Sequence, residues 1–169
     1  EGTFDYPKEN LLPRGPVPVK WMEYRGHYLY EDNLVLSYSI NGRDILEMPA
    51  KAQGFGAIIH TLRVDAGAQP LKLSVGKLEM PGLRNGFLDP KAPTVKLNNA
   101  AASPTDQIIV SGLPAKEGLG QFTAAATFGQ TDDLQWSFDE RNRMVLTIPA
   151  SRQDRLFQVI RYSGQSDAQ

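Results

Sequence analysis

The chain has 169 residues, 41% of them apolar, which suits a single ordinary globular domain. Its 18 Lys and Arg residues against 19 Asp and Glu residues give a formal net charge of -1, which excludes the strongly basic surface typical of nucleic-acid or anionic-membrane binding. The chain has no cysteine, so disulfides, thiolate catalysis, cysteine-ligated zinc, iron–sulfur clusters and CxxCH haem attachment are excluded within it.

No apolar stretch approaches the roughly 18 residues that a membrane-spanning helix needs, so we expect no transmembrane segment. The chain starts at Glu1 without a positively charged start and an apolar run. We therefore expect any signal peptide to be absent or already removed. The lack of cysteine does not fix the compartment, because reduced cytosolic domains and oxidised secreted domains can both lack it.

The N-terminal residues 1–18 contain four prolines, which favour an extended arm over a helix. Pro18 could occupy the first position of one short helical turn through Trp21 to Tyr24, which Gly26 would end. Alternation of apolar and small polar residues predicts a strand over 34–40. Asn41-Gly42 then predicts a tight hairpin turn into a returning strand at 44–48.

Further short strands are expected along the rest of the chain, at 58–64, 71–75, 94–97, 108–110, 122–128, 134–138 and 144–148. The Gly- and Pro-rich segment 76–93 indicates a long loop with one short strand. The segment Arg155 to Tyr162 fits either a helix or a strand buried on both faces, and the surrounding β pattern favours the strand.

These nine or ten short strands predict an all-β fold, an antiparallel β-sandwich or jelly roll. No composition break divides the chain. We therefore expect a proline-rich arm at 1–18, a single sandwich domain at 19–163 and a frayed tail at 164–169.

Catalytic motifs are weak. No GxSxG elbow, GxGxxG or GxxxxGK loop occurs, and the adjacent acidic pairs fall at predicted turns. His60 shares a strand face with apolar neighbours, which favours a satisfied core histidine, and no metal site is expected. One enzyme hypothesis remains, in which dispersed residues form a site, namely His27, His60, Glu47 and Asp32. It requires a cleft where a histidine meets a carboxylate.

Aromatic residues cluster near the start of the chain, and four of them are candidate ligand-binding residues: Trp21, Tyr24, Tyr28 and Tyr30. Exposed on one surface, their rings would suit a sugar or a partner protein. Alternatively, they seal the sandwich edge beneath the arm. Rings that line an open groove would favour sugar binding, whereas rings packed against another chain would favour docking.

Two stretches of sequence carry a family resemblance. The first runs from Gly15-Pro16-Val17-Pro18 through Tyr24-Arg25-Gly26-His27-Tyr28-Leu29-Tyr30 and Asp32 to Leu34-Val35-Leu36-Ser37-Tyr38-Ser39-Ile40, Gly42 and Ile45-Leu46-Glu47. The second comprises Trp136, Asp139-Glu140, Met144-Val145-Leu146, Ile148-Pro149 and Phe157-Gln158-Val159-Ile160. Between them, 58–64 followed by Pro70-Leu71 fits the same order. This pattern resembles a β-rich region of large secreted bacterial haem-binding, membrane-bound dehydrogenase-like proteins, the part that precedes a sorbosone-dehydrogenase-like propeller.

The resemblance implies export to the periplasm or beyond, and it implies that the chain is a subunit or domain of a larger assembly. Its motifs are structural, and without CxxCH any haem would belong to absent domains or partner subunits. We therefore expect a non-catalytic docking module of a secreted c-type cytochrome or dehydrogenase-like assembly, without a cofactor of its own. A carbohydrate-binding module and the dispersed-site enzyme are the alternatives.

Overall fold

The computed structural model describes residues 21–54, 56–77, 82–89, 92–96, 103–104, 108–115 and 118–165. Its strands, in chain order, are β1 (Met22–Tyr30), β2 (Asn33–Ile40), β3 (Arg43–Lys51), β4 (Ala57–Val64), β5 (Leu71–Gly76), β6 (Arg84–Asp89), β7 (Ala92–Lys96), β8 (Ser103–Pro104), β9 (Ile108–Ala115), β10 (Gly118–Gly129), β11 (Gln135–Phe138), β12 (Met144–Ile148) and β13 (Arg155–Gln165). No helix capable of spanning a membrane occurs in the described part of the chain.

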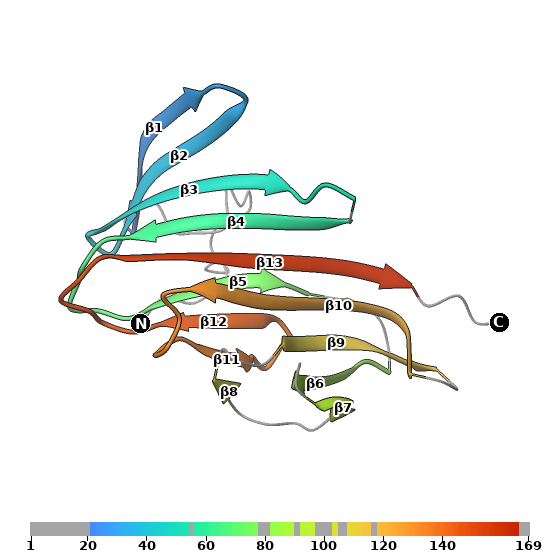
Figure 1. Cartoon of the computed structure of the whole chain (residues 1–169). Helices are drawn as coiled ribbons and strands as arrows, with labels where there is room; N and C mark the ends of the chain where they lie inside the picture. Colours follow the sequence, from blue (N-terminus) through green and yellow to red (C-terminus); the bar gives the residue numbers. More distant parts are fainter. Residues whose placement is uncertain are drawn as a thin grey trace, which may run out of the picture.

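The strands form two antiparallel sheets (Figure 1). The larger sheet has nine strands in the order β1-β2-β3-β4-β13-β10-β9-β6-β7, and the smaller has four in the order β5-β12-β11-β8. Strands β1 to β4 form a simple meander, after which the C-terminal β13 lies between β4 and β10. The predicted all-β antiparallel sandwich is therefore confirmed.

The hydrophobic core lies between the two sheets. The smaller sheet contributes Trp136 and Leu146, which are fully buried. The larger sheet contributes alternate residues from its central strands, so that most of its buried residues lie on one face, although Ala57 and Val110 on the opposite face are also buried. The buried members on the larger sheet include Ile45, Leu62, Val64, Phe87, Ile109, Ala125, Phe157 and Val159. We call the face that carries these residues the inner face, and the opposite one the outer face.

The hairpin turns follow local chemistry. Asn41 and Gly42 both have positive φ angles, 50° and 74°, and they connect paired residues Ile40 and Arg43. Few side chains tolerate this conformation, and Asn-Gly is the sequence that best suits it. The predicted hairpin at this position is confirmed.

The expected helical turn from Trp21 to Tyr24 is wrong, because β1 begins at Met22 and pairs with β2 throughout its length. Gly26 does not end a helix. It lies beside a β-bulge, where the register shifts between Tyr24 and Gly26, and its φ of 130° suits glycine alone. Cross-strand pairing and this bulge thus override the helix-start signal of the preceding proline.

At the other end of the chain, the strand predicted from Arg155 is confirmed as β13. The strand extends further than expected, and Gly164 still pairs with Phe122, so the first residues of the predicted tail belong to the sheet. The predicted arm and residues 166–169 lie outside the described residues. Within the predicted long loop, the structure places β6 and the start of β7.

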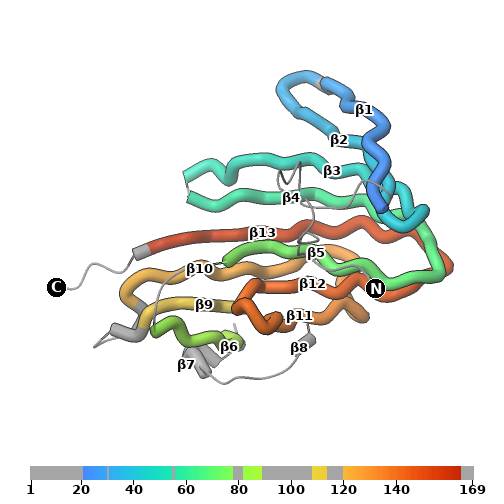
Figure 2. Tube along the Cα trace, turned by 180° about the vertical axis from the view of Figure 1, so that it is seen from behind, coloured from blue at the N-terminus to red at the C-terminus, as the bar shows by residue number. Residues whose placement is uncertain are grey.

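The two sheets differ greatly in width, and this leaves part of the larger sheet without a second layer. Contacts between the sheets run from β12 to β9 and from β5 to β13. The β1–β2 hairpin lies at the opposite end of the molecule from β8 and β11 and points away from the body in both views (Figures 1 and 2). The far half of the hairpin therefore projects from the sandwich, whereas Tyr38 and Ile40 at its base pack against the core.

Candidate functional site

The projecting strand β1 carries the three most exposed large apolar side chains of the described residues. Leu29 is 77% exposed, Tyr28 60% and Tyr24 57%. Single exposed apolar residues are ordinary on protein surfaces, but three on one nine-residue strand form a concentrated apolar surface. This concentration makes the hairpin the first candidate for a binding site.

The bulge in β1 decides where these side chains point. Tyr24 pairs with Tyr38 and Gly26 pairs with Ser37, so Arg25 is an extra residue in the ladder. Strict alternation would put Tyr24 and Tyr28 on the same face. The bulge instead places Tyr24 on the inner face and Tyr28 on the outer face.

The predicted ring cluster is consequently divided. Trp21 is half-buried just before β1, and its carbonyl oxygen accepts a hydrogen bond of 3.0 Å from the Asn41 amide. Tyr24 and Tyr28 lie on opposite faces, and the side chain of Tyr30 lies outside the described residues. The rings of Tyr24 and Tyr28 therefore do not form one flat platform.

The far half of the hairpin is apolar on both faces. Leu29 pairs with Leu34 on the inner face, and Tyr28 pairs with Val35 on the outer face. Uninterrupted apolar runs of this kind are typical of strands that are covered on both sides. The tip is acidic, because Glu31 and Asp32 are both exposed there.

A hydrogen-bonded network crosses three strands where the hairpin joins the sandwich. Glu47 on β3 receives a bond of 2.7 Å from the Tyr38 hydroxyl and one of 2.6 Å between its Oε1 and His60 Nδ1. All three residues lie on the inner face, and the side chains of Glu47 and His60 are 20% and 35% exposed. Because an ionised carboxylate only accepts hydrogen bonds, the proton of this second bond resides on Nδ1.

The network shifts the pKa values of Glu47 and Tyr38. The hydrogen bond from His60 lowers the pKa of Glu47; burial opposes this shift and the Tyr38 hydroxyl reinforces it. Burial, followed by the charge of Glu47, raises the pKa of Tyr38. Glu47 is therefore held as an anion whose two oxygens both have donors, which orients the imidazole of His60.

The structure brings together only part of the dispersed enzyme site. His60 and Glu47 are in contact, whereas Asp32 lies at the exposed hairpin tip and His27 contacts Tyr24, with 2.9 Å between Nδ1 and the hydroxyl. His60 does lie on the core face, as predicted, but at the edge of the core. Among the described residues, no group of three or more His, Asp or Glu side chains could hold a metal ion.

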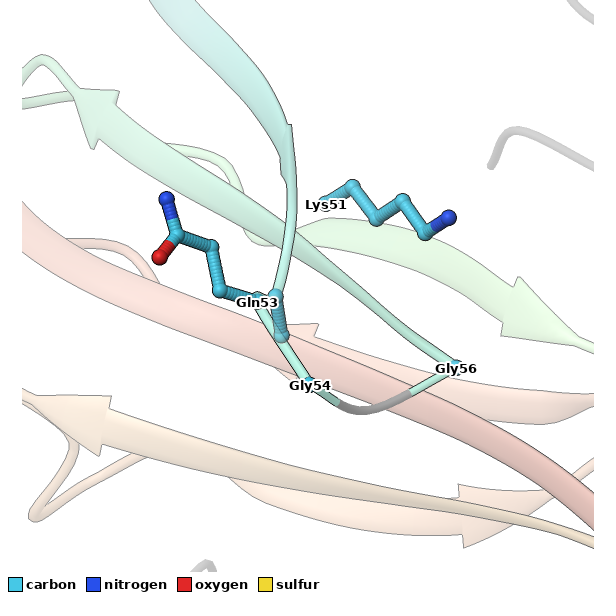
Figure 3. Close-up of a pocket in the computed structure, with 5 residues that line it drawn as sticks. Lys51, Gln53, Gly54 and Gly56 are labelled. Carbon is cyan, nitrogen blue, oxygen red and sulfur yellow. The ribbon is translucent and has the colours of Figure 1, made fainter.

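Two adjoining depressions lie at the turn between β3 and β4. Figure 3 shows the larger of these two. Their volumes are about 580 and 460 Å³, and both are lined by Lys51 and Gly56. Lys51 and Gln53 extend to opposite sides of the chain in Figure 3, so these polar groups do not converge on one ligand. Ligand pockets usually combine apolar walls with convergent polar groups, which makes this a poor candidate for a small-molecule site.

The sequence interpretation missed a second apolar surface, on the outer face of β10 and β13. Phe128, Leu156 and Tyr162 are 54%, 56% and 40% exposed, and the register places all three on this face. The sequence did contain a sign of this surface, because the segment from Arg155 to Tyr162 has apolar residues on both of its faces. A strand at the surface of a two-layer sandwich needs only one apolar face.

Comparison with known families gives a match at the N-terminal end of the chain. A family model described as a domain of unknown function, DUF6797, matches residues 1–47, which include β1, β2 and the first part of β3. No curated protein matches the chain. The match covers well under half of the sequence, but it includes the whole projecting hairpin.

Proposed function

We propose that the chain is a non-catalytic docking module, and that its β1–β2 hairpin binds a neighbouring domain or subunit of a larger assembly. The observation that carries the proposal is the exposure of Tyr24, Tyr28 and Leu29 on a hairpin that projects past the second sheet. A strand pair with apolar side chains on both faces is stabilised when both faces are buried. A groove in a partner protein would bury both faces of this hairpin.

The charge at the hairpin tip indicates the charge expected on the partner. The exposed Glu31 and Asp32 at the tip favour a groove that is apolar along its length and basic at its end. β1 is also an edge strand of the nine-stranded sheet, so the backbone N–H and C=O groups along its free edge can pair with an added strand. The proposed partner is therefore a folded protein domain, not a soluble metabolite.

The resemblance to secreted haem-binding, membrane-bound dehydrogenase-like proteins suggests which assembly this is. On this proposal the module is exported, and it contributes structure to a c-type cytochrome or dehydrogenase-like complex whose haem is bound elsewhere. A sugar-binding role has less support, because Tyr24 and Tyr28 lie on opposite faces. A dispersed-site enzyme has less support, because the depressions at the β3–β4 end lack His60 in their lining.

The test uses the native assembly isolated through a tagged chain. We expect a stoichiometric complex that contains a second, different polypeptide beside the 18.7 kDa chain, with an absorption spectrum that reveals any haem. The Leu29→Asp variant should lose the complex, because it adds a charge to the apolar hairpin. The matched control is Ile58→Asp, which places the same charge on an exposed aliphatic side chain of β4, outside the hairpin.

Retention of the complex by Leu29→Asp at the wild-type level would contradict the role of the hairpin. Recovery of the native chain as a colourless monomer would contradict the whole proposal and would make a glycan-binding screen the next step.

A further inference from the structure

The outer face of the larger sheet has an apolar centre formed by four adjacent strands, β3, β4, β13 and β10. Cross-strand pairing brings Ala50, Ile59, Ile160 and Ala126 into one row across these strands. All four are only partly buried, and they are small or aliphatic. In a two-layer sandwich, the residues on the face away from the core are usually polar. The apolar residues on this face therefore indicate that another layer of protein packs against it.

Polar side chains on this face already satisfy one another. Gln158 donates a hydrogen bond of 3.1 Å to the Thr61 hydroxyl. At one end of the face, Arg63 pairs with Asp154 at 2.8 Å and with Asp65 at 3.5 Å. The centre of this face is therefore electrically neutral, and a partner surface that is also neutral and apolar would be complementary to it.

We propose that this outer face is an interface between two copies of the chain, packed sheet against sheet. Two sheets pack face to face when their twists are similar. Two copies of the same sheet necessarily have the same twist, so they meet this condition. A net charge of -1 adds little repulsion between copies. The C2 dimer, with the same patch on both partners, is the commonest arrangement of this kind.

The area reaches the lower limit for a specific interface between two copies. Four strands about 4.8 Å apart, with about eight paired residues at about 3.4 Å each, cover about 500 Å² in each copy. Two copies would bury about 1,000 Å² of flat area, the lower bound for a specific interface. The exposed rings of Phe128 and Tyr162 add further apolar contact at opposite ends of the patch.

The experiment measures the mass of the purified chain by light scattering and by analytical ultracentrifugation over a series of dilutions. The wild-type chain should approach twice 18.7 kDa as its concentration rises. Ala126→Arg and Leu156→Glu should each remain at the monomer mass, because each adds a charge within the contact. Circular dichroism and a cooperative urea transition check that both variants fold.

Leu29→Glu is the control, since Leu29 lies on the projecting hairpin rather than on this face. It should dimerise like the wild-type chain. A wild-type chain that stays monomeric at every concentration would overturn the inference and would assign the face to a different partner. Dimers that survive both outer-face substitutions, or that are lost only with Leu29→Glu, would overturn it as well. None of these outcomes depends on the native complex, so failure here is separate from failure of the docking proposal.

Discussion

The part of the nine-stranded sheet that is covered by the second sheet and the projecting β1–β2 hairpin both consist of antiparallel strands. They differ in how far their inner-face side chains are buried. In the covered part, the inner-face residues of β4 and β13, such as Leu62 and Phe157, are almost completely buried beneath the second sheet. On the hairpin, residues of similar size such as Leu29 and Tyr24 are mostly exposed on the same face. The difference shows that this domain does not bury Leu29 and Tyr24, the side chains that the docking proposal assigns to a partner.

The border between the two parts is held by buried polar groups. Arg43, at the start of β3, is 1% exposed and donates hydrogen bonds to the carbonyl oxygens of Asp65, Gln69 and Pro149 at 3.0 to 3.3 Å. Those oxygens belong to the loops before β5 and before β13. Arg43 therefore anchors the packed sandwich at the point where the hairpin leaves it.

The largest predicted effect concerns the packed core. Trp136→Ala should lower the free energy of unfolding by about 3–5 kcal/mol, because it removes a fully buried ring. Leu29→Ala, on the exposed hairpin, should change it by less than about 0.5 kcal/mol. Urea denaturation followed by circular dichroism measures both, and equal losses would show that the hairpin is part of the cooperative core.

The next effect concerns the anchor. A Cβ at Gly67 would overlap Cγ of Arg43, so Gly67→Ala should displace this buried side chain and lower the free energy of unfolding by about 1–3 kcal/mol. Gly56→Ala is the control, since its nearest atom, on Tyr162, is 3.9 Å away and ordinary contact results. Thermal unfolding of the two variants compares them, and an equally stable Gly67→Ala protein would contradict the tight packing of Arg43.

A smaller effect is expected from the network at the border. The pKa of Glu47 is lowered in the folded chain from its ordinary value of 4.5, chiefly by the hydrogen bond from His60. The stability that this carboxylate contributes is therefore complete above its ordinary pKa and is lost as the pH falls through the lowered folded value. Glu47→Gln should flatten this loss in urea titrations across the acidic range. Identical acid profiles for the two proteins would exclude Glu47 as the source.

The smallest effect concerns the base of the hairpin. Arg25 lies 2.5 Å from Asp44 on β3, and both side chains are nearly half exposed, so Arg25→Ala should cost no more than about 1 kcal/mol. Its effect should be local, because the pair links β1 to β3 across β2. Hydrogen exchange should show faster exchange of β1 amides and unchanged exchange in β12. A uniform change in both strands would contradict a local tether.

Sequence periodicity predicted the parts that depend on neighbouring residues. Alternation identified the strand that became β2, and Asn41-Gly42 identified its turn, because turn chemistry is local. The bulge at Arg25 was not predictable, since it depends on the register between β1 and β2. That one extra residue decides whether Tyr24 and Tyr28 share a face.

The candidate site shows the same division between local and non-local information. His60 was correctly placed on the core face from its own strand, but its contact with Glu47 requires the register of β3 against β4. The apolar outer face depends on β13 lying between β4 and β10, which are far apart in the chain. Single-strand patterns record which faces are apolar, whereas strand order determines which apolar faces meet.

Hydrogen exchange of the β1–β2 hairpin, compared between the purified chain and the native assembly, tests the central claim most directly. Docking predicts that amides in the far half of the hairpin, residues 27–35, exchange rapidly in the free chain and become strongly protected in the assembly, while those of β12, buried in both, do not change. Equal exchange of the hairpin in the two states would contradict the account, because the hairpin would then have no partner to cover it.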